Sequence, residues 1–455
     1  MKAFIMNMLL IHFLQMNTPV PRDIPIPLPL PEWLLVVLLV FSFLLHIVFV
    51  NLMVGGSMVT LWAEIKGLKN KAYDTLAYEV ARTITVNKSL AVVLGVAPLL
   101  SINALYTIYF YSANALTGLM WILIIPLVAV AFLLTYLHKY TWHSMAHLKR
   151  LHIAIIGASV LLFLFIPLIF LVNINLMLFP EKWSSIHGFI SALFLPNVFP
   201  RYLHFIFASL AVTGLFLFWY VGRKNYPFET IFPADISRYD VKKIAYSLTL
   251  GASVIQFLIG PIVLISLPSK GFGWGLLSII LTGASLALIA MWWIWKALIG
   301  PKEAINRRFG AIVILMSITV LFMGSGRHTY RANALDPHRQ LMAEKTAAFE
   351  KLSEEARMHP QQSNTAEVVD SSLGTVAKGA ALFKTNCSIC HQKDTKLVGP
   401  PITEMVSIYK NNISGLEQWI KAPGKKRPDY PQMPTLSQLS DADRAELAKY
   451  ILSIQ

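Results

Sequence analysis

The sequence is poor in cysteine, with only two among its 455 residues. Two thiols cannot supply the set of ligands that a Cys-rich zinc site uses, so the chain does not contain such a site. Both cysteines fall in one short run, Cys387-Ser388-Ile389-Cys390-His391, in which a histidine directly follows the second thiol. The sulfur chemistry of cysteine is therefore concentrated at a single place.

The spacing of this run is typical of covalent haem attachment. Two thiols two residues apart can add to the two vinyl groups of one haem, and the adjacent imidazole can reach the iron. A redox dithiol or half of a zinc site is the alternative, and it must explain why His391 follows Cys390 directly. The run predicts one haem c, attached to Cys387 and Cys390 and liganded by His391.

A second iron ligand is expected from a distant loop, usually a methionine whose thioether favours reduced iron and raises the potential. Met433, in Tyr430-Pro431-Gln432-Met433-Pro434, lies in that region and is the favoured candidate. Met405 competes with it, but it lies only 14 residues beyond His391 in an expected short helix. There it more naturally packs against the edge of the porphyrin.

The residues around the run complete a small helical domain. Gly379 belongs to a short helix and permits close approach to a terminal helix, which Ser440 can cap. The backbone near Pro400 can offer a carbonyl to the outer nitrogen of His391 and so fix the ring. Residues 375–455 therefore resemble a class I cytochrome c throughout.

The rest of the chain predicts a membrane protein. Hydrophobic residues make up 55% of the sequence, and the mean hydropathy is +0.57. A bilayer core takes about 20 apolar residues, and lipid offers no partner to backbone amides, so each span must be a helix. We expect an all-α fold in which a polytopic transmembrane bundle is joined to a small all-α cytochrome domain. The eight expected spans lie near 34–62, 89–111, 116–137, 153–177, 202–222, 244–267, 273–296 and 309–325.

Basic residues predict the orientation of the bundle. The connections after spans one, three, five and seven are rich in Lys and Arg and belong on the cytoplasmic side. The C-terminus then lies outside, where c-type haem is attached in bacteria. We expect a multi-pass protein of the bacterial inner membrane with its cytochrome domain in the periplasm. Met1–Met16 is an uncleaved signal-like segment or an interfacial helix, and Pro19–Pro31 lies outside.

Three domains follow from these patterns: a membrane bundle over 1–335, a helical and flexible linker over 336–374, and the cytochrome domain over 375–455. The formal charge of +15 comes mostly from inner loops, so it does not indicate nucleic acid binding. Lysines of the haem domain could form a basic edge that steers an acidic partner, or they could be ordinary solvated side chains.

Histidines inside a membrane are costly unless they are used, so each is a candidate ligand. His46 lies within the first span and His204 near the outer end of the fifth. His138, His143, His147 and His152 cluster at the inner boundary and are expected to be interface histidines; His328, after the eighth span, is ambiguous.

The membrane part is distantly similar to the large subunit of cytochrome bd quinol oxidases. The segments that carry the resemblance occur in the family's order: Leu44 to Gly55, Leu94-Gly95-Val96-Ala97, Leu195-Pro196-Asn197, Pro200 to His204, Ala208 to Gly214 and Gly326-Arg327-His328-Thr329-Tyr330. The resemblance implies that His46 ligates a high-spin haem b and His204 a low-spin haem b.

The sequence departs from that family where chemistry is done. The glutamate of the oxygen-reducing site falls at Asn103, and the glutamate before Gly-Arg falls at Gly324. Ile279 or a neighbour stands where the low-spin haem has its methionine, and the quinol-binding loop is reduced to a few residues. Asn and Gly cannot ligate iron and pass protons as a carboxylate does, which speaks against oxygen reduction.

These patterns predict a respiratory electron-transfer subunit with one haem c and one or two b-type haems. The alternatives are a divergent oxidase that reduces oxygen or another small acceptor, and a haem-free anchor for the cytochrome domain. The expected partners are the lipid bilayer, redox proteins and other membrane respiratory subunits.

Overall fold

The computed structural model describes residues 28–358, 375–425, 430, 432–436 and 439–454, and these contain helices and no strand. Contacts divide the chain into two compact units, Met1–Thr346 and Ala347–Gln455. The expectations for Met1–Met16 and for most of the Pro-rich stretch lie outside the described residues. The last membrane helix and the expected helical part of the linker form one helix, α12 (Phe309–Met358).

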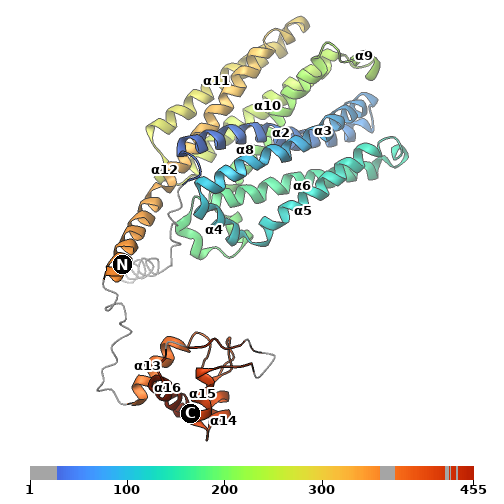
Figure 1. The fold of residues 1–455 in the computed structure, drawn as a ribbon. Coiled ribbons are helices and arrows are strands. Elements are labelled where there is room, and N and C mark those ends of the chain that lie inside the picture. The colour runs from blue at the N-terminus through green and yellow to red at the C-terminus, as the bar shows by residue number, and fades with distance from the viewer. Residues whose placement is uncertain (1–27, 359–374, 426–429, 431, 437–438, 455) are drawn as a thin grey trace, which may run out of the picture. The chain divides into compact units, whose positions relative to one another are not determined.

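Long helices lie side by side in the first unit (Figure 1). Seven helices in the described part of the chain are long and apolar enough to span a membrane, and a bent pair raises the number to eight. This confirms the predicted class of a polytopic all-α protein. The long helices are α2 (Glu32–Gly67), α3 (Lys71–Leu105), α5 (Leu119–Tyr140), α6 (Lys149–Leu176), α8 (Val198–Gly222), α10 (Arg238–Ile265), α11 (Trp274–Ile299) and α12; the short ones are α4 (Thr107–Thr117), α7 (Phe189–Leu193) and α9 (Phe228–Ile231).

The expected span at 89–111 is a bent pair of helices, the end of α3 and the short α4. The chain breaks at Tyr106, and α4 leaves the line of α3 by 109°. Burial explains the bend, because Tyr106 is 4% exposed and its ring faces the guanidinium of Arg331 at 5.3 Å. The hydroxyl of Thr107 donates to the carbonyl of Asn103 at 2.7 Å, which satisfies an acceptor that the bend leaves free.

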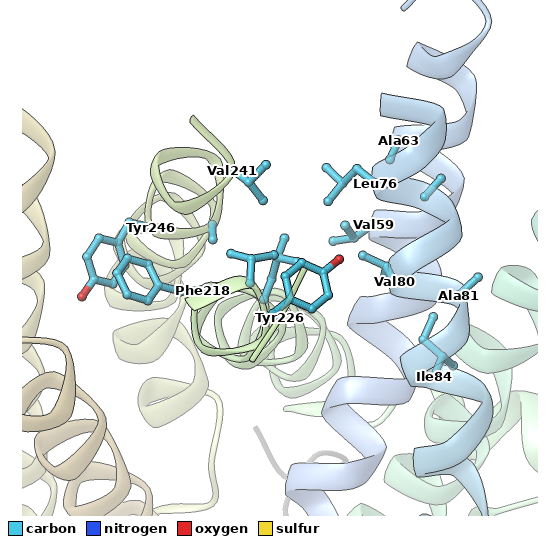
Figure 2. Packing of buried hydrophobic residues seen from close by; sticks show 14 of the residues in the cluster. Val59, Ala63, Leu76, Val80, Ala81, Ile84, Phe218, Tyr226, Val241 and Tyr246 are labelled. Carbon is cyan, nitrogen blue, oxygen red and sulfur yellow. The ribbon is translucent and has the colours of Figure 1, made fainter. Parts of the chain in front are cut away.

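One apolar cluster holds α2 and α3 against α8 and α10 (Figure 2). Phe218 and Tyr246 stack with ring centroids 4.1 Å apart, while Val59 and Leu76 contribute from α2 and α3. Glycines allow the backbones to approach: a methyl group at Gly214 would lie 2.6 Å from the carbonyl oxygen of Ala245. Small residues at crossings are the usual means of close packing between membrane helices.

The outer faces of the long helices are apolar, as residues on α5, α10 and α11 show. Ile125, Ile265 and Trp274 are 77%, 82% and 87% exposed, respectively. Water would disfavour so much exposed apolar area, whereas lipid accommodates it. The first unit is therefore a multi-pass membrane domain.

The second unit is a small helical domain built from α13 (Thr375–Asn386), α14 (Ile402–Tyr409), α15 (Ile413–Lys421) and α16 (Asp441–Ser453). Ser440 caps α16, since its Oγ accepts from the backbone N–H of Asp443 at 3.1 Å, as the sequence predicted. Helices α13 and α16 cross at Gly379, where a methyl group would lie 2.5 Å from Cβ of Tyr450. The predicted close approach of these helices is confirmed.

Candidate functional site

The Cys-x-x-Cys-His run lies in a compact turn directly after α13. The N–H of Cys387 donates to the carbonyl of Phe383 at 2.8 Å, and that of His391 donates to the carbonyl of Cys387 at 2.9 Å. The two cysteines do not form a disulfide with each other, and Cys387 is buried while Cys390 is half-buried. Burial, reinforced by the neighbouring Cys390, raises the pKa of the Cys387 thiol to about 11. The turn thus presents two thiols and one imidazole from five consecutive residues.

His391 is held by the segment that follows it. Its Nδ1 lies 2.8 Å from the carbonyl oxygen of Pro400, and a carbonyl can only accept, so Nδ1 carries the proton and donates. Nε2 is left with a lone pair suited to iron. Gly399 makes room for the ring, because a methyl group there would lie 2.7 Å from Nδ1. These residues fit a covalently attached haem with an axial histidine.

The two candidate methionines have similar surroundings. Met433 and Met405 are both partly buried and both pack against the apolar core of the domain. That core includes Cys387 and Phe383. Either thioether is therefore available to the haem side of the domain, and Met433 stays the prediction from loop position.

His46 is oriented in the same manner as His391. Its Nδ1 lies 2.8 Å from the carbonyl oxygen of Ala91 on α3, so Nδ1 donates and Nε2 keeps its lone pair. Gly95 borders the ring, and a methyl group there would come within 2.9 Å of Cε1. This is the arrangement expected of a metal-ligating histidine.

His204 lies near the start of α8, and Asn197 sets where that helix begins. Asn197 has a φ of 74°, which asparagine tolerates better than most residues, and its Nδ2 donates to the carbonyl of Val263 at 2.6 Å. Nδ1 of His204 is buried and has no hydrogen-bond partner among the described residues, while Nε2 is 3.4 Å from Nε2 of Gln256. A buried imidazole with an unused nitrogen is unusual unless another group completes it.

Helices α2 and α8 bring the two histidines to the same end of the bundle. The hydroxyl of Ser209 donates to Oδ1 of Asn51 at 3.0 Å, and Gly55, one turn further along α2, packs against Thr213, one turn further along α8. The helices therefore run parallel. His46 and His204 both precede this contact in their helices.

Arg201, which precedes His204 by one helical turn, belongs to a group of three arginines that were not among the predicted ligands. The guanidinium group of Arg327 lies close enough to those of Arg201 and Arg331 for their positive charges to repel one another. Arg331 is 8% exposed, and Nε of Arg327 is buried with no hydrogen-bond partner in the part of the chain that the structure describes. In the described part of the chain, none of the three guanidinium groups forms an ion pair with a carboxylate. The signal was present in the sequence as arginines in apolar helices, but their convergence depends on the fold.

The positions at which the sequence departs from the bd pattern are also visible. Oδ1 of Asn103 is buried, and no described residue forms a hydrogen bond with it. Ile279 packs near Gly326, since a methyl group at that glycine would lie 3.3 Å from it.

Comparisons with known proteins agree with this division of the chain. The family model for cytochrome c matches residues 376–455. No protein of curated function matches the sequence significantly. A chain of the bd oxidase from Geobacillus thermodenitrificans is similar in structure, with a TM-score of 0.52 and 14% identity, over 67% of this chain and 87% of that chain.

Residues 376–455 thus form a cytochrome c domain, and the membrane domain has a bd-oxidase-like fold. The protein is a multi-pass membrane cytochrome that takes part in electron transfer and carries haem c.

Proposed function

We propose that the protein is an electron-transfer subunit of a bacterial respiratory chain, holding one haem c outside the cytoplasm and b-type haem in its membrane domain. Haem iron supplies a one-electron couple when it is bound. The chain's own residues position the groups, tune the iron and exclude water.

In the cytochrome domain, Cys387 and Cys390 would form the thioether attachments and His391 would ligate the iron through Nε2. The carbonyl of Pro400 fixes the imidazole, and Met433 would supply the second iron ligand. Ile389 is 76% exposed beside this turn, and Val398 is 48% exposed. Such an apolar edge, with lysines around it, suits brief docking of a redox partner.

In the membrane domain, His204 is the ligand of one b-type haem and His46 that of a second. The observation that carries this part is the set of buried groups left incomplete by the protein: Nδ1 of His204 and Nε of Arg327. Arg201, Arg327 and Arg331 add positive charge with no carboxylate partner among the described residues. Haem would bring an iron for the unprotonated ring nitrogen of His204, and two propionate carboxylates that can accept hydrogen bonds from the arginine N–H groups, Nε of Arg327 among them.

Basic loops and the chemistry of haem attachment together support the location. Lys66, Lys149 and Arg223 lie near one set of helix ends, and the positive-inside rule assigns these to the cytoplasm. His46 and His204 then lie toward the outer side, as does the cytochrome domain. Redox proteins outside the membrane and membrane respiratory subunits are the proposed partners.

A pyridine haemochrome measurement on the purified full-length protein tests the proposal. We expect one haem c and one or two haem b per chain, with loss of haem b and retention of haem c in His204→Ala and His46→Ala. His187→Ala is the matched control, because His187 is exposed. Haem c alone in the unmodified protein would reduce the membrane domain to an anchor. Binding of carbon monoxide to reduced haem b would instead favour a divergent oxidase.

A further inference from the structure

A second group of potential ligands lies far from His46 along α2. Glu64, His138 and His152 come from α2, α5 and α6 and are 0%, 1% and 0% exposed. One ligand atom from each lies within 4.8 Å of the others. His138 and His152, which the sequence grouped with His143 and His147 as interface histidines, are buried between helices, whereas His143 and His147 are exposed.

The three side chains meet head to head. Oε2 of Glu64 is 2.7 Å from Nε2 of His138, and Oε1 is 2.5 Å from Nδ1 of His152. Nε2 of His152 donates to the backbone carbonyl of His138 at 2.7 Å. Histidines that bind metals usually donate their other ring N–H to such a carbonyl, which orients the ring and raises its basicity.

The site is rigid because each ligand belongs to a different long helix. The imidazoles of His138 and His152 stack with centroids 4.0 Å apart and an angle of 26° between them. Trp142 packs edge-on against both rings, with centroids 5.2 and 5.0 Å away. Both imidazoles therefore present one ring nitrogen each to the same carboxylate.

A positive charge already contacts this carboxylate. Nζ of Lys149 is 2.9 Å from Oε1 of Glu64 and 2.7 Å from Oδ1 of Asp74. Lys149, Asp74 and Trp142 also line a cavity of about 470 Å³. Lys149 thus stands between the buried ligands and this cavity, which gives an ion a route to the site and gives the ammonium group room to move aside.

We infer that Glu64, His138 and His152 bind a divalent metal ion of the zinc class, which displaces the ammonium group of Lys149. Two imidazoles and one carboxylate are a ligand set that Zn²⁺ accepts, with a fourth position left for water. Zinc–ligand bonds of about 2.0–2.2 Å place tetrahedral ligand atoms about 3.3 Å apart. The observed separations of 2.5 and 2.7 Å need to open by less than about 1 Å.

The metal site is separate from the proposed haem sites. Glu64 follows His46 by 18 residues on α2, a distance of about 27 Å at the rise of an α-helix. A metal ion here would fasten α2, α5 and α6 together without touching a haem ligand. Its binding is therefore expected to leave the haem spectra unchanged.

The test uses haem-loaded, full-length protein without a polyhistidine tag, stripped with chelator and then dialysed against Zn²⁺. We expect one tightly bound zinc per chain, with about two imidazoles in its X-ray absorption spectrum. Glu64→Gln and His152→Asn should each weaken binding by more than about 100-fold, because loss of a ligand costs more than loss of an outer partner. Lys149→Met should tighten binding, since it removes the competing cation.

His143→Ala and His147→Ala are the matched controls and should bind zinc as the unmodified protein does. His138→Gln provides a second ligand variant if His152→Asn does not fold, with haem c content reporting on folding. Absence of stoichiometric zinc in the folded, unmodified protein would overturn the inference. Equal zinc affinity in the folded ligand variants and the controls would overturn it as well, and would leave the cluster as a structural ion pair.

Discussion

At the scale of single residues, two of the candidate haem ligands are held in orientation in the same way. His391 and His46 each donate Nδ1–H to a backbone carbonyl at 2.8 Å, from Pro400 and Ala91 respectively. Each also lies against a glycine that has no room for a methyl group. His204 lacks this restraint, so it depends more on the group that completes it. The ring of His391 is thus held in orientation by the protein alone, whereas the ring of His204 on α8 is not.

Gly399→Ala tests how closely His391 is held. The added methyl group would lie 2.7 Å from Nδ1. We expect it to push the ring away from Pro400, to lower the free energy of unfolding by about 1–3 kcal/mol and to reduce haem c attachment. Gly424→Ala is the control, because its methyl group would meet the Trp419 ring at an ordinary 3.7 Å. Haem c yield and thermal unfolding, measured side by side, would show equal behaviour if the contact did not matter.

Met433→Ala addresses the second iron ligand. Loss of a thioether ligand removes the preference for reduced iron, so we expect the haem c potential to fall by a substantial part of the roughly 0.8 V that axial ligands control. The absorption band of the methionine–iron bond, at the red end of the visible spectrum, should be lost in the same variant. Met405→Ala is the matched variant, since both side chains pack on the same core. If the potential fell in Met405→Ala alone, Met405 would be the iron ligand and Met433 a packing residue.

At the scale of helices, periodicity and length predicted most spans, because lipid leaves a helix as the only way to cross. The turn at Tyr106 could not be predicted, since it depends on burial of that ring beside Arg331, which is more than two hundred residues away in the chain. The convergence of Glu64, His138 and His152 is equally non-local. Local sequence patterns therefore predicted the helices and the Cys-x-x-Cys-His site. The cluster of Arg201, Arg327 and Arg331 and the cluster of Glu64, His138 and His152 depend on contacts between distant helices and could only be seen in the structure.

Gly214→Ala tests the crossing of α8 and α10. Its methyl group would lie 2.6 Å from the carbonyl oxygen of Ala245, so the helices must separate. We expect a lower melting temperature of the membrane domain, equivalent to about 1–3 kcal/mol, and a loss of haem b that follows the shift of α8. Gly251→Ala on α10 is the control, because its methyl group would meet nothing within 4 Å. A thermal unfolding scan that does not distinguish the variants would contradict this account of the crossing.

At the scale of the whole molecule, charge is distributed unevenly. The chain has 39 basic and 24 acidic residues, and many of the basic ones lie in the connections between spans. The arginines Arg201, Arg327 and Arg331 are the exception, since they lie among apolar helices. Charge in the loops bears on orientation, and charge inside the bundle bears on the bound cofactor.

The orientation can be measured with a reporter fused after Gln455. An alkaline phosphatase fusion, which folds only outside the cytoplasm, is expected to be active there, and a matched fusion in the basic connection after Tyr140 is expected to be inactive. Fluorescent protein fusions at the same two places should give the opposite pattern. Phosphatase activity only in the fusion after Tyr140 would show that the topology is the reverse of the proposed one. The argument for an external cytochrome domain would then fail.

The firm hold on His391 also has a kinetic consequence. An electron-transfer step slows when bonds and angles around the redox centre must rearrange as its charge changes, and this cost is the reorganisation energy. A ring pinned between the Pro400 carbonyl and Gly399 has little freedom to rearrange. The histidine side of the iron should therefore contribute little reorganisation energy, so that any slow structural adjustment between oxidation states falls on the loop that carries Met433.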